Sequence, residues 1–222
     1  SGVQLWKDHS GNADRGERLK GHHWGILGLI GWEETNQRYW CWSLKMRLIS
    51  GKLNPFQFIV DPQGVARRAD FWDGVVPLLL DLKSQLGSAV LRVVVDAYFC
   101  KVPFLQPLSS VGIHVITRMR KDAVTWDQRI ESENKKSVKM AGEWKLARLV
   151  REFTPQKLAV KIYGKSVQVE AVEREVFIRG FQSQVKVVVV KGSKEPIIFL
   201  STDLTLSTIQ IIEIYAARFS IE

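Results

Sequence analysis

Residues 90–100 of the chain read VLRVVVDAYFC, and this stretch decides the fold class. Three consecutive valines are typical of a strand that is buried on both faces, as in a parallel or mixed sheet flanked by helices. The residues that follow predict a short helix over 101–110 and a second strand over 113–118. Because the connections are short, a strand, a helix and a strand in this order indicate a parallel crossover. The sequence therefore predicts an α/β fold.

Asp96 follows the valines, at the position where the predicted strand ends. A carboxylate in this place can cap a helix or a turn. It can also be a site residue, because ligands of open α/β sheets bind at the carboxyl ends of the strands. The residues by themselves leave both interpretations open.

Two strands and a helix are predicted before this unit. Residues 21–31 form a glycine-punctuated apolar run, and residues 38–49 alternate between two faces. The stretch EETNQ between them is typical of a turn, so the pair is expected to be a hairpin. Residues 69–86 carry a broad apolar stripe and predict a helix, in which Pro77 is expected to cause a kink or a break.

The pattern changes after residue 120. Strands are favoured over four stretches, which are residues 144–150, 158–163, 167–176 and 185–190. Residues 197–201 are the last strand of this segment or the return to the main sheet. We therefore divide the chain into a core over residues 1–120, a β-rich insertion over 121–200, and a return helix of the core over 201–222.

The chain is expected to end on a helix. Ser207 and Gln210 have the spacing of a capping box, so the helix is expected to begin near Ser207. An apolar packing stripe is formed by Ile209, Ile212 and Ala216. Tyr215, Arg218 and Glu222 project together, because residues three and four apart are neighbours on a helix. The alternative interpretation is an exposed ion pair between Arg218 and Glu222, which are four residues apart.

The charge of the chain narrows the class of its partners. Its 32 Lys and Arg residues outnumber 23 Asp and Glu residues, which gives a net charge of +9. This balance favours polyanions, with nucleic acid ahead of anionic membranes. Residues 118–151 hold ten basic and five acidic residues, although a run of this kind also fits a solvated face.

Targeting segments and cysteine spacing both bear on the location that is expected for the protein. No apolar run reaches the roughly 18 residues that span a bilayer, and residues 1–10 lack the pattern of a signal peptide. The sequence therefore predicts a soluble intracellular protein. Cys41 and Cys100 have no CxxC spacing and are expected to be buried thiols rather than zinc ligands.

Tyr215, Arg218 and Glu222 have the spacing Tyr-x2-Arg-x3-Glu, which resembles the signature of the DDE transposases of bacterial insertion sequences. The stretches VVVDAYF, GIHVITRMRKDA and LSTDLTLSTIQIIEIYAARFSIE also resemble this family, and the resemblance covers about residues 21–222. It implies an RNase H-like mixed sheet flanked by helices, with a β-rich insertion before the last helix.

The resemblance also implies roles for single residues. Asp96 corresponds to the second Asp and Glu222 to the Glu of the catalytic set, so both are expected to be catalytic and to bind Mg²⁺ or Mn²⁺, two ions in the intact enzyme. DNA binding is expected of five further side chains, which are Tyr215 and Arg218 beside the metal site, and Arg118, Arg120 and Lys121 after the strand next to Asp96. The three basic residues that follow this strand can also serve solubility alone.

The family's first Asp is the point at which the sequence departs from the pattern. Asp8 and Asp14 lie in polar, glycine-containing sequence and are interpreted as loop residues. The first strand with its Asp is expected upstream of Ser1, and the usual continuation of the signature lies beyond Glu222. The chain is therefore interpreted as a piece that is truncated at both ends and inactive by itself.

The predicted function is that of a transposase catalytic domain, which cleaves phosphodiester bonds and transfers the strands of a mobile element. The expected partners are DNA, as transposon ends and target, and a second copy of the chain in a synaptic complex. The expected location is the bacterial cytoplasm, at the nucleoid. The alternatives are a catalytically inactive DNA-binding relic and another RNase H-like nuclease, such as a resolvase.

Overall fold

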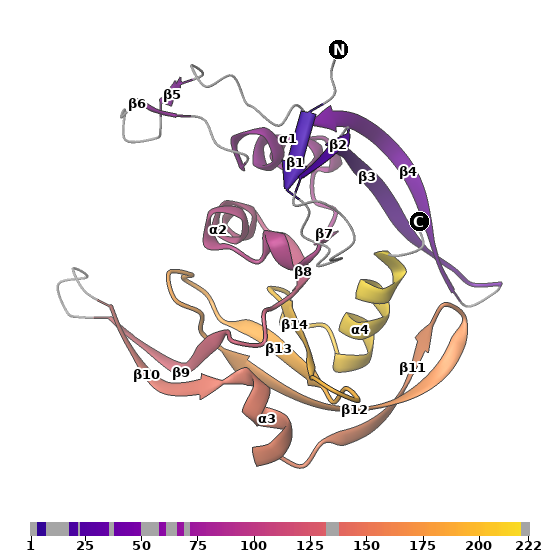
Figure 1. Ribbon diagram of the computed structural model, residues 1–222, viewed down its shortest axis with the longest axis vertical. Coiled ribbons are helices and arrows are strands. Elements are labelled where there is room, and N and C mark those ends of the chain that lie inside the picture. The colour runs from indigo at the N-terminus through magenta and orange to yellow at the C-terminus, as the bar shows by residue number, and fades with distance from the viewer. Residues whose placement is uncertain are drawn as a thin grey trace.

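A mixed sheet of six strands forms the centre of the computed structural model (Figure 1). The structure describes the backbone of residues 4–7, 18–21, 23–35, 38–49, 58–60, 66–68, 72–131 and 138–218, and side chains chiefly from residue 75 onward. The strand order is β11–β12–β13–β14–β8–β7. β7 (Leu91–Val94) and β8 (Ile113–Arg118) run parallel, whereas the other neighbouring strands are antiparallel. The predicted α/β class is confirmed, and the architecture is compatible with an RNase H-like fold.

The parallel pair is joined by the crossover that the sequence predicts. A 3₁₀ turn, η1 (Ala97–Phe99), follows β7 and leads into α2 (Val102–Ser110), which returns the chain to β8. α2 buries Phe104, Leu105 and Leu108. The valines of β7 are only half-buried, because β7 is the last strand in the order and pairs with β8 alone among the described strands. The expectation of a strand buried on both faces is therefore wrong.

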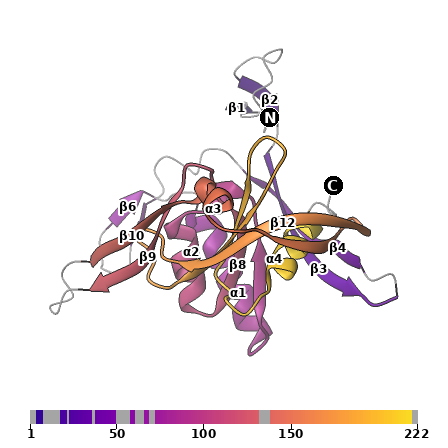
Figure 2. The same cartoon turned by 90° about the horizontal axis from the view of Figure 1, so that it is seen from below.

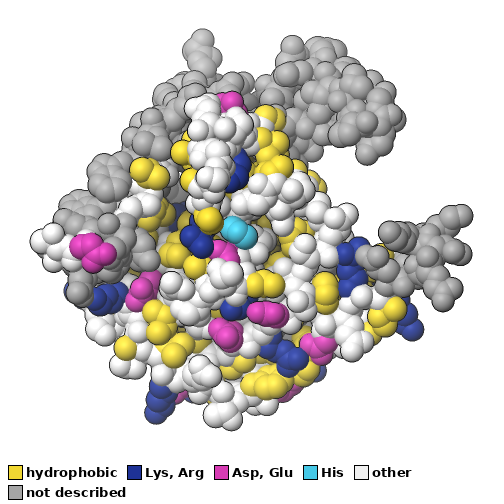
Figure 3. Space-filling model, turned by 180° about the vertical axis from the view of Figure 1, so that it is seen from behind, with side chains coloured by type: hydrophobic (Ala, Val, Ile, Leu, Met, Phe, Trp, Pro, Cys, Tyr) yellow, Lys and Arg dark blue, Asp and Glu magenta, His cyan; other side chains and the backbone are white. Residues whose placement is uncertain are grey.

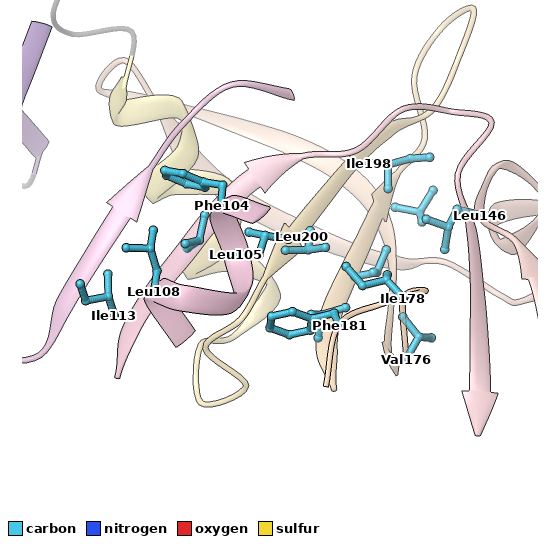
Figure 4. Close-up of a cluster of buried hydrophobic side chains, with 14 of the residues drawn as sticks. Phe104, Leu105, Leu108, Ile113, Leu146, Val176, Ile178, Phe181, Ile198 and Leu200 are labelled. Atoms are coloured by element: carbon cyan, nitrogen blue, oxygen red, sulfur yellow. The ribbon is translucent and has the colours of Figure 1, made fainter. Parts of the chain in front are cut away.

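Side chains that alternate along the strands build a core on each face of the sheet. In β13 (Val185–Val190), Val187 belongs to one cluster and Val188 to the other, as the two-residue period of a strand requires. α1 (Trp72–Leu86) and α2 contribute to the first cluster, which is shown in Figure 4. α4 (Thr208–Ala217) contributes to the second. The two clusters explain why this strand is a nearly continuous run of valines.

The N-terminal third contributes three antiparallel pairs of strands: β1 (Gln4–Lys7) with β2 (Arg18–Gly21), β3 (His23–Glu33) with β4 (Arg38–Ile49), and β5 (Phe58–Val60) with β6 (Ala66–Arg68). The hairpin predicted from the alternation of residues 38–49 is confirmed in β3 and β4. β4 lies against α4 (Figure 1). α1 continues through Pro77 as one helix rather than breaking there.

The second half of the chain adds strands to the sheet and a separate hairpin. Its remaining elements are β9 (Val124–Glu131), β10 (Val138–Lys145), α3 (Leu146–Glu152), β11 (Gln156–Ile162), β12 (Lys165–Val176) and β14 (Ile197–Ser201). β11 to β14 continue the sheet of β7 and β8, whereas β9 and β10 pair with each other. This hairpin and the hairpin of β3 and β4 project from opposite sides of the molecule (Figure 2). The strand expected over residues 144–150 is wrong, because the chain turns into α3 at Leu146.

Asp127 anchors the hairpin of β9 and β10 to β12. Its carboxylate accepts a hydrogen bond from Trp144 Nε1 at 2.6 Å and another from Arg174 at 2.9 Å. Gly142 lies across from it with a φ of 69°, and a Cβ atom there would come within 2.8 Å of the carboxylate. Glycine is therefore required where the two strands approach each other.

α4 begins as the sequence predicts. The Ser207 side chain accepts a hydrogen bond from the Gln210 backbone N–H, and the Gln210 side chain accepts one from the Ser207 N–H, which completes the capping box. The buried face of α4 is formed by Thr208, Ile211, Ile212, Tyr215 and Ala217. Within the described residues, no helix is both long enough and apolar enough to cross a membrane.

Candidate active site

The parallel pairing of β7 and β8 places Asp96 and Arg118 on the same side of the sheet. Val94 is paired with Ile116, and both belong to the core cluster that includes α4. The ladder continues one residue further, where the Val95 N–H donates to the Ile116 carbonyl at 3.0 Å. Since successive residues of a strand face opposite sides, Asp96 and Arg118 follow Val94 and Ile116 toward the α4 side. Both lie at the carboxyl end of the parallel pair.

Asp96 is held in position by hydrogen bonds to its side chain and to its carbonyl, which also accepts from the Phe99 N–H at 3.2 Å. Its Oδ1 atom accepts from the Tyr98 N–H at 2.9 Å, which makes Asp96 the N-cap of η1. Its carbonyl accepts from the buried Thr117 hydroxyl at 2.7 Å. The residue itself is exposed. The capping interpretation is thus confirmed, and it leaves the carboxylate on the surface, where a site residue is needed.

Tyr215 lies at the same end of the sheet. Phe199 of β14 is paired with Arg118 of β8, and the rings of Phe199 and Tyr215 are 5.1 Å apart between centroids. Only 4% of Tyr215 is exposed, so the residue is part of the buried face of α4. This burial argues against the expectation that Tyr215 contacts phosphates directly.

Electrostatic interactions connect Tyr215 to the predicted site residues. Burial raises the pKa of the Tyr215 hydroxyl, and the charge of Asp96 raises this pKa further. The positive charges of Arg218 and Arg118, with a hydrogen bond from Arg218, act in the opposite direction. Charges shift a pKa in this way when they lie close to the titrating group. The structure therefore brings Asp96, Arg118, Tyr215 and Arg218 together.

Arg218 projects from the C-terminal end of α4. Its guanidinium carbon is 5.3 Å from the centroid of the Tyr215 ring, within the range of a cation–π contact. Glu222 lies outside the described residues, so its predicted approach to Asp96 stays a prediction.

Arg120 and Lys121 follow β8 and are both engaged in exposed ion pairs. Arg120 Nε lies 3.1 Å from Asp122 Oδ1, and Lys121 Nζ lies 2.6 Å from Glu195 Oε1. Exposed pairs of this kind contribute little to stability, so both cations can exchange their partner for a phosphate. Figure 3 shows acidic and basic side chains interspersed over one face of the molecule. Of the two cations, Lys121 is paired with an acid from outside the basic stretch 118–151.

A buried ion pair that the sequence analysis missed fixes the connection between β14 and α4. Asp203 has 3% of its side chain exposed, and its Oδ2 atom accepts from Arg92 Nε of β7 at 2.8 Å. Its Oδ1 atom accepts from the backbone N–H and the hydroxyl of Thr205 at 3.0 and 2.6 Å. The cluster of Ser, Thr and Asp in the stretch STDLTLS is the local signal of such a turn.

The protonation of Asp203 depends on these partners. Burial by itself raises the pKa of the carboxyl group, but hydrogen bonds from Thr205 and Arg92 and the charge of His114 outweigh it and hold the pKa below its ordinary value. Asp203 therefore stays ionised and tied to Arg92. This pair anchors the start of α4 to β7, and so it sets the position from which Tyr215 and Arg218 are presented.

The chain is similar to a known protein family. From residue 32 to residue 222, the chain matches the family model described as Transposase DDE domain. The match includes β7, β8 and α4, together with the four residues that lie on or directly after them at the end of the sheet. No curated protein matches the chain.

Proposed function

The chain belongs to the DDE transposase family, and from this membership we propose that it is the catalytic domain that cleaves phosphodiester bonds and transfers the strands of a mobile DNA element. One observation carries the proposal. An exposed carboxylate, Asp96, shares the carboxyl end of a parallel strand pair with Arg118, Tyr215 and Arg218. An acid beside two guanidinium groups is suited to hold a phosphodiester next to a metal ligand.

Asp96 fits a hard divalent cation. Its carboxylate is exposed and oriented by the Tyr98 N–H. Mg²⁺ prefers a few carboxylate oxygens together with waters and substrate phosphates. We propose that Asp96 and Glu222 are ligands of Mg²⁺ or Mn²⁺, and that the site binds two such ions. When bound, the two metal ions stabilise the attacking and leaving oxygens of an in-line displacement.

The side chains around Asp96 bind and orient the DNA. Arg118 and Arg218 offer planar guanidinium groups, which can hold a phosphate through two parallel hydrogen bonds. Tyr215 supports this function indirectly. Its buried ring packs on Phe199 and contacts the Arg218 guanidinium. The role that fits Tyr215 best is therefore to position Arg218. Arg120 and Lys121 extend the basic surface along the connection after β8.

The proposed partners are the DNA of the transposon ends and of the target, with a second copy of the chain in a synaptic complex. The proposed location, where the chain would meet both partners, is the bacterial cytoplasm. The net charge of +9 supports a polyanionic partner.

DNA binding by this surface is expected to depend steeply on salt, since each neutralised phosphate releases counterions. Replacing Arg118, Arg120 and Lys121 together by Ala is expected to flatten the slope of the logarithm of affinity against that of salt concentration. The change is about one unit for each lost phosphate contact. Fluorescence anisotropy with labelled duplex DNA over a series of salt concentrations measures this slope.

A matched control removes positive charge from the same stretch of sequence but from another surface. Arg148 and Arg151 lie on α3, which packs on β12 and β13, and both are exposed. Their double replacement by Ala is expected to leave the slope nearly unchanged. A slope that is unaffected by the triple variant, or equally affected by the control, would assign Arg118, Arg120 and Lys121 to a merely solvated face.

A further inference from the structure

An exposed aromatic ring lies directly beside the proposed metal ligand. Tyr98 is 52% exposed. Its backbone N–H donates to Asp96 Oδ1 at 2.9 Å, so the main chain of Tyr98 is held beside this carboxylate. A DNA strand whose phosphate reaches Asp96 therefore comes close to an exposed aromatic residue.

The ring of Tyr98 is supported from inside the protein. It meets Phe99 edge to face, with centroids 5.6 Å apart and an angle of 83° between the ring planes. Phe99 in turn packs against Phe104 at 5.1 Å, and Phe104 is fully buried in α2. Edge-to-face contacts of this kind favour a fixed orientation of the rings. The exposed ring is thus the outer end of an aromatic series that is anchored in the core.

A cation accompanies the exposed ring. The Lys101 ammonium lies 4.5 Å from the centroid of the Tyr98 ring. An aromatic surface next to a positive charge is the combination by which proteins bind unpaired nucleotides, because the base stacks and the backbone phosphate is neutralised. Since every base has a π face, such binding is tolerant of sequence.

We propose that Tyr98 stacks on an unpaired base next to the phosphodiester held at Asp96, and that Lys101 contacts the neighbouring phosphate. The ligand is a nucleotide of a locally opened DNA strand. Tyr98 is then a positioning residue, which holds the strand in register with the carboxylate without touching the reacting atoms. This inference rests on the proposed function, since it places the scissile phosphate at Asp96.

The test uses the whole chain and a DNA duplex of arbitrary sequence with a short unpaired 3′ tail that carries 2-aminopurine. Stacking quenches the fluorescence of this base. The wild-type chain and Tyr98→Phe, which keeps the ring, are expected to quench it. Tyr98→Leu is expected to lose the quenching and to bind the tailed DNA on the order of tenfold more weakly. Its affinity for fully paired DNA stays that of the wild type.

Controls separate this inference from the proposed function and from misfolding. Tyr163→Leu removes another exposed ring, in the turn between β11 and β12, and is expected to have no effect. Thermal unfolding checks that Tyr98→Leu is folded, and Tyr98→Phe gives a second, conservative variant. Equal quenching and affinity for Tyr98→Leu and the wild type would overturn the role of Tyr98 alone. Failure of the wild type to bind either DNA would overturn the proposed function as well.

Discussion

Replacement of Asp96 by Asn is expected to weaken the binding of Mn²⁺ to the chain by about a hundredfold or more. The affinity of an oxygen site for a divalent cation depends on the number of charged ligands, and even outer residues of metal sites change it by 10–100-fold when replaced. The amide oxygen of Asn can still accept from the Tyr98 N–H, so η1 is expected to keep its cap. Titration of the chain with Mn²⁺, followed by the electron paramagnetic resonance of the free ion, measures the affinity.

Two further variants make this result specific. Glu222→Gln is expected to match Asp96→Asn, because both remove one charged oxygen ligand. Asp122→Asn removes an exposed carboxylate that pairs with Arg120, and it is expected to bind Mn²⁺ as the wild type does. If Asp96→Asn also bound Mn²⁺ like the wild type, Asp96 would not be a metal ligand.

The same variants bear on catalysis. With Mg²⁺ or Mn²⁺ and DNA that contains a transposon end, cleavage is expected to fall to background in Asp96→Asn, because the carboxylate that is proposed to bind the ion is lost. Asp122→Asn is expected to leave cleavage unchanged. Equal cleavage by Asp96→Asn and the wild type would contradict a catalytic role of Asp96.

Replacement of Asp203 by Ala is expected to lower the free energy of unfolding by about 2–3 kcal/mol at neutral pH. Removing one partner of a buried ion pair leaves the other charge uncompensated, which typically costs about 3–5 kcal/mol, and the partial exposure of Arg92 reduces this figure. Urea unfolding followed by circular dichroism measures the difference. Asp122→Ala, which breaks an exposed pair, is the matched control and is expected to cost less than about 1 kcal/mol.

The effect of Asp203 is expected to depend on pH with a defined sign. The pKa of its carboxyl group is lowered below the ordinary value of 3.8. Its contribution to stability is therefore fully present above this value and is lost as the pH falls through the lowered pKa. The stability difference between the wild type and Asp203→Ala should shrink under strongly acidic conditions. A difference that is absent at neutral pH would contradict the anchoring role of the pair.

The elements that the sequence predicts well are those with local signals. The capping box at Ser207, the alternation in β4 and the apolar run of β8 each depend on residues that are close in the chain. Residues 144–150 illustrate the opposite case. Leu146 and Leu149 are both fully buried and lie three positions apart, which fits one face of a helix, but a short apolar run does not distinguish a helix from a strand.

The parts of the site that could not be predicted depend on distant residues. Glu195 pairs with Lys121 across 74 positions, and Asp203 pairs with Arg92 across 111 positions. The burial of Tyr215 likewise depends on Phe199 of another strand. Helical spacing alone groups Tyr215 with Arg218, but it does not show that one side chain is buried and supports the other. Such contacts follow from the order of strands in the sheet.

A crystal structure of the chain with bound Mn²⁺ shows whether Asp96 and Glu222 hold metal ions between them at the end of β7. The anomalous signal locates the ion independently of the protein atoms. We expect Mn²⁺ to be bound by carboxylate oxygens of both residues, whose carboxyl groups then lie about 4–8 Å apart. Carboxyl groups on opposite faces of the sheet, or more than about 12 Å apart with no hinge to close the gap, would exclude a shared metal site, since metal-assisted displacement needs both acids in one place.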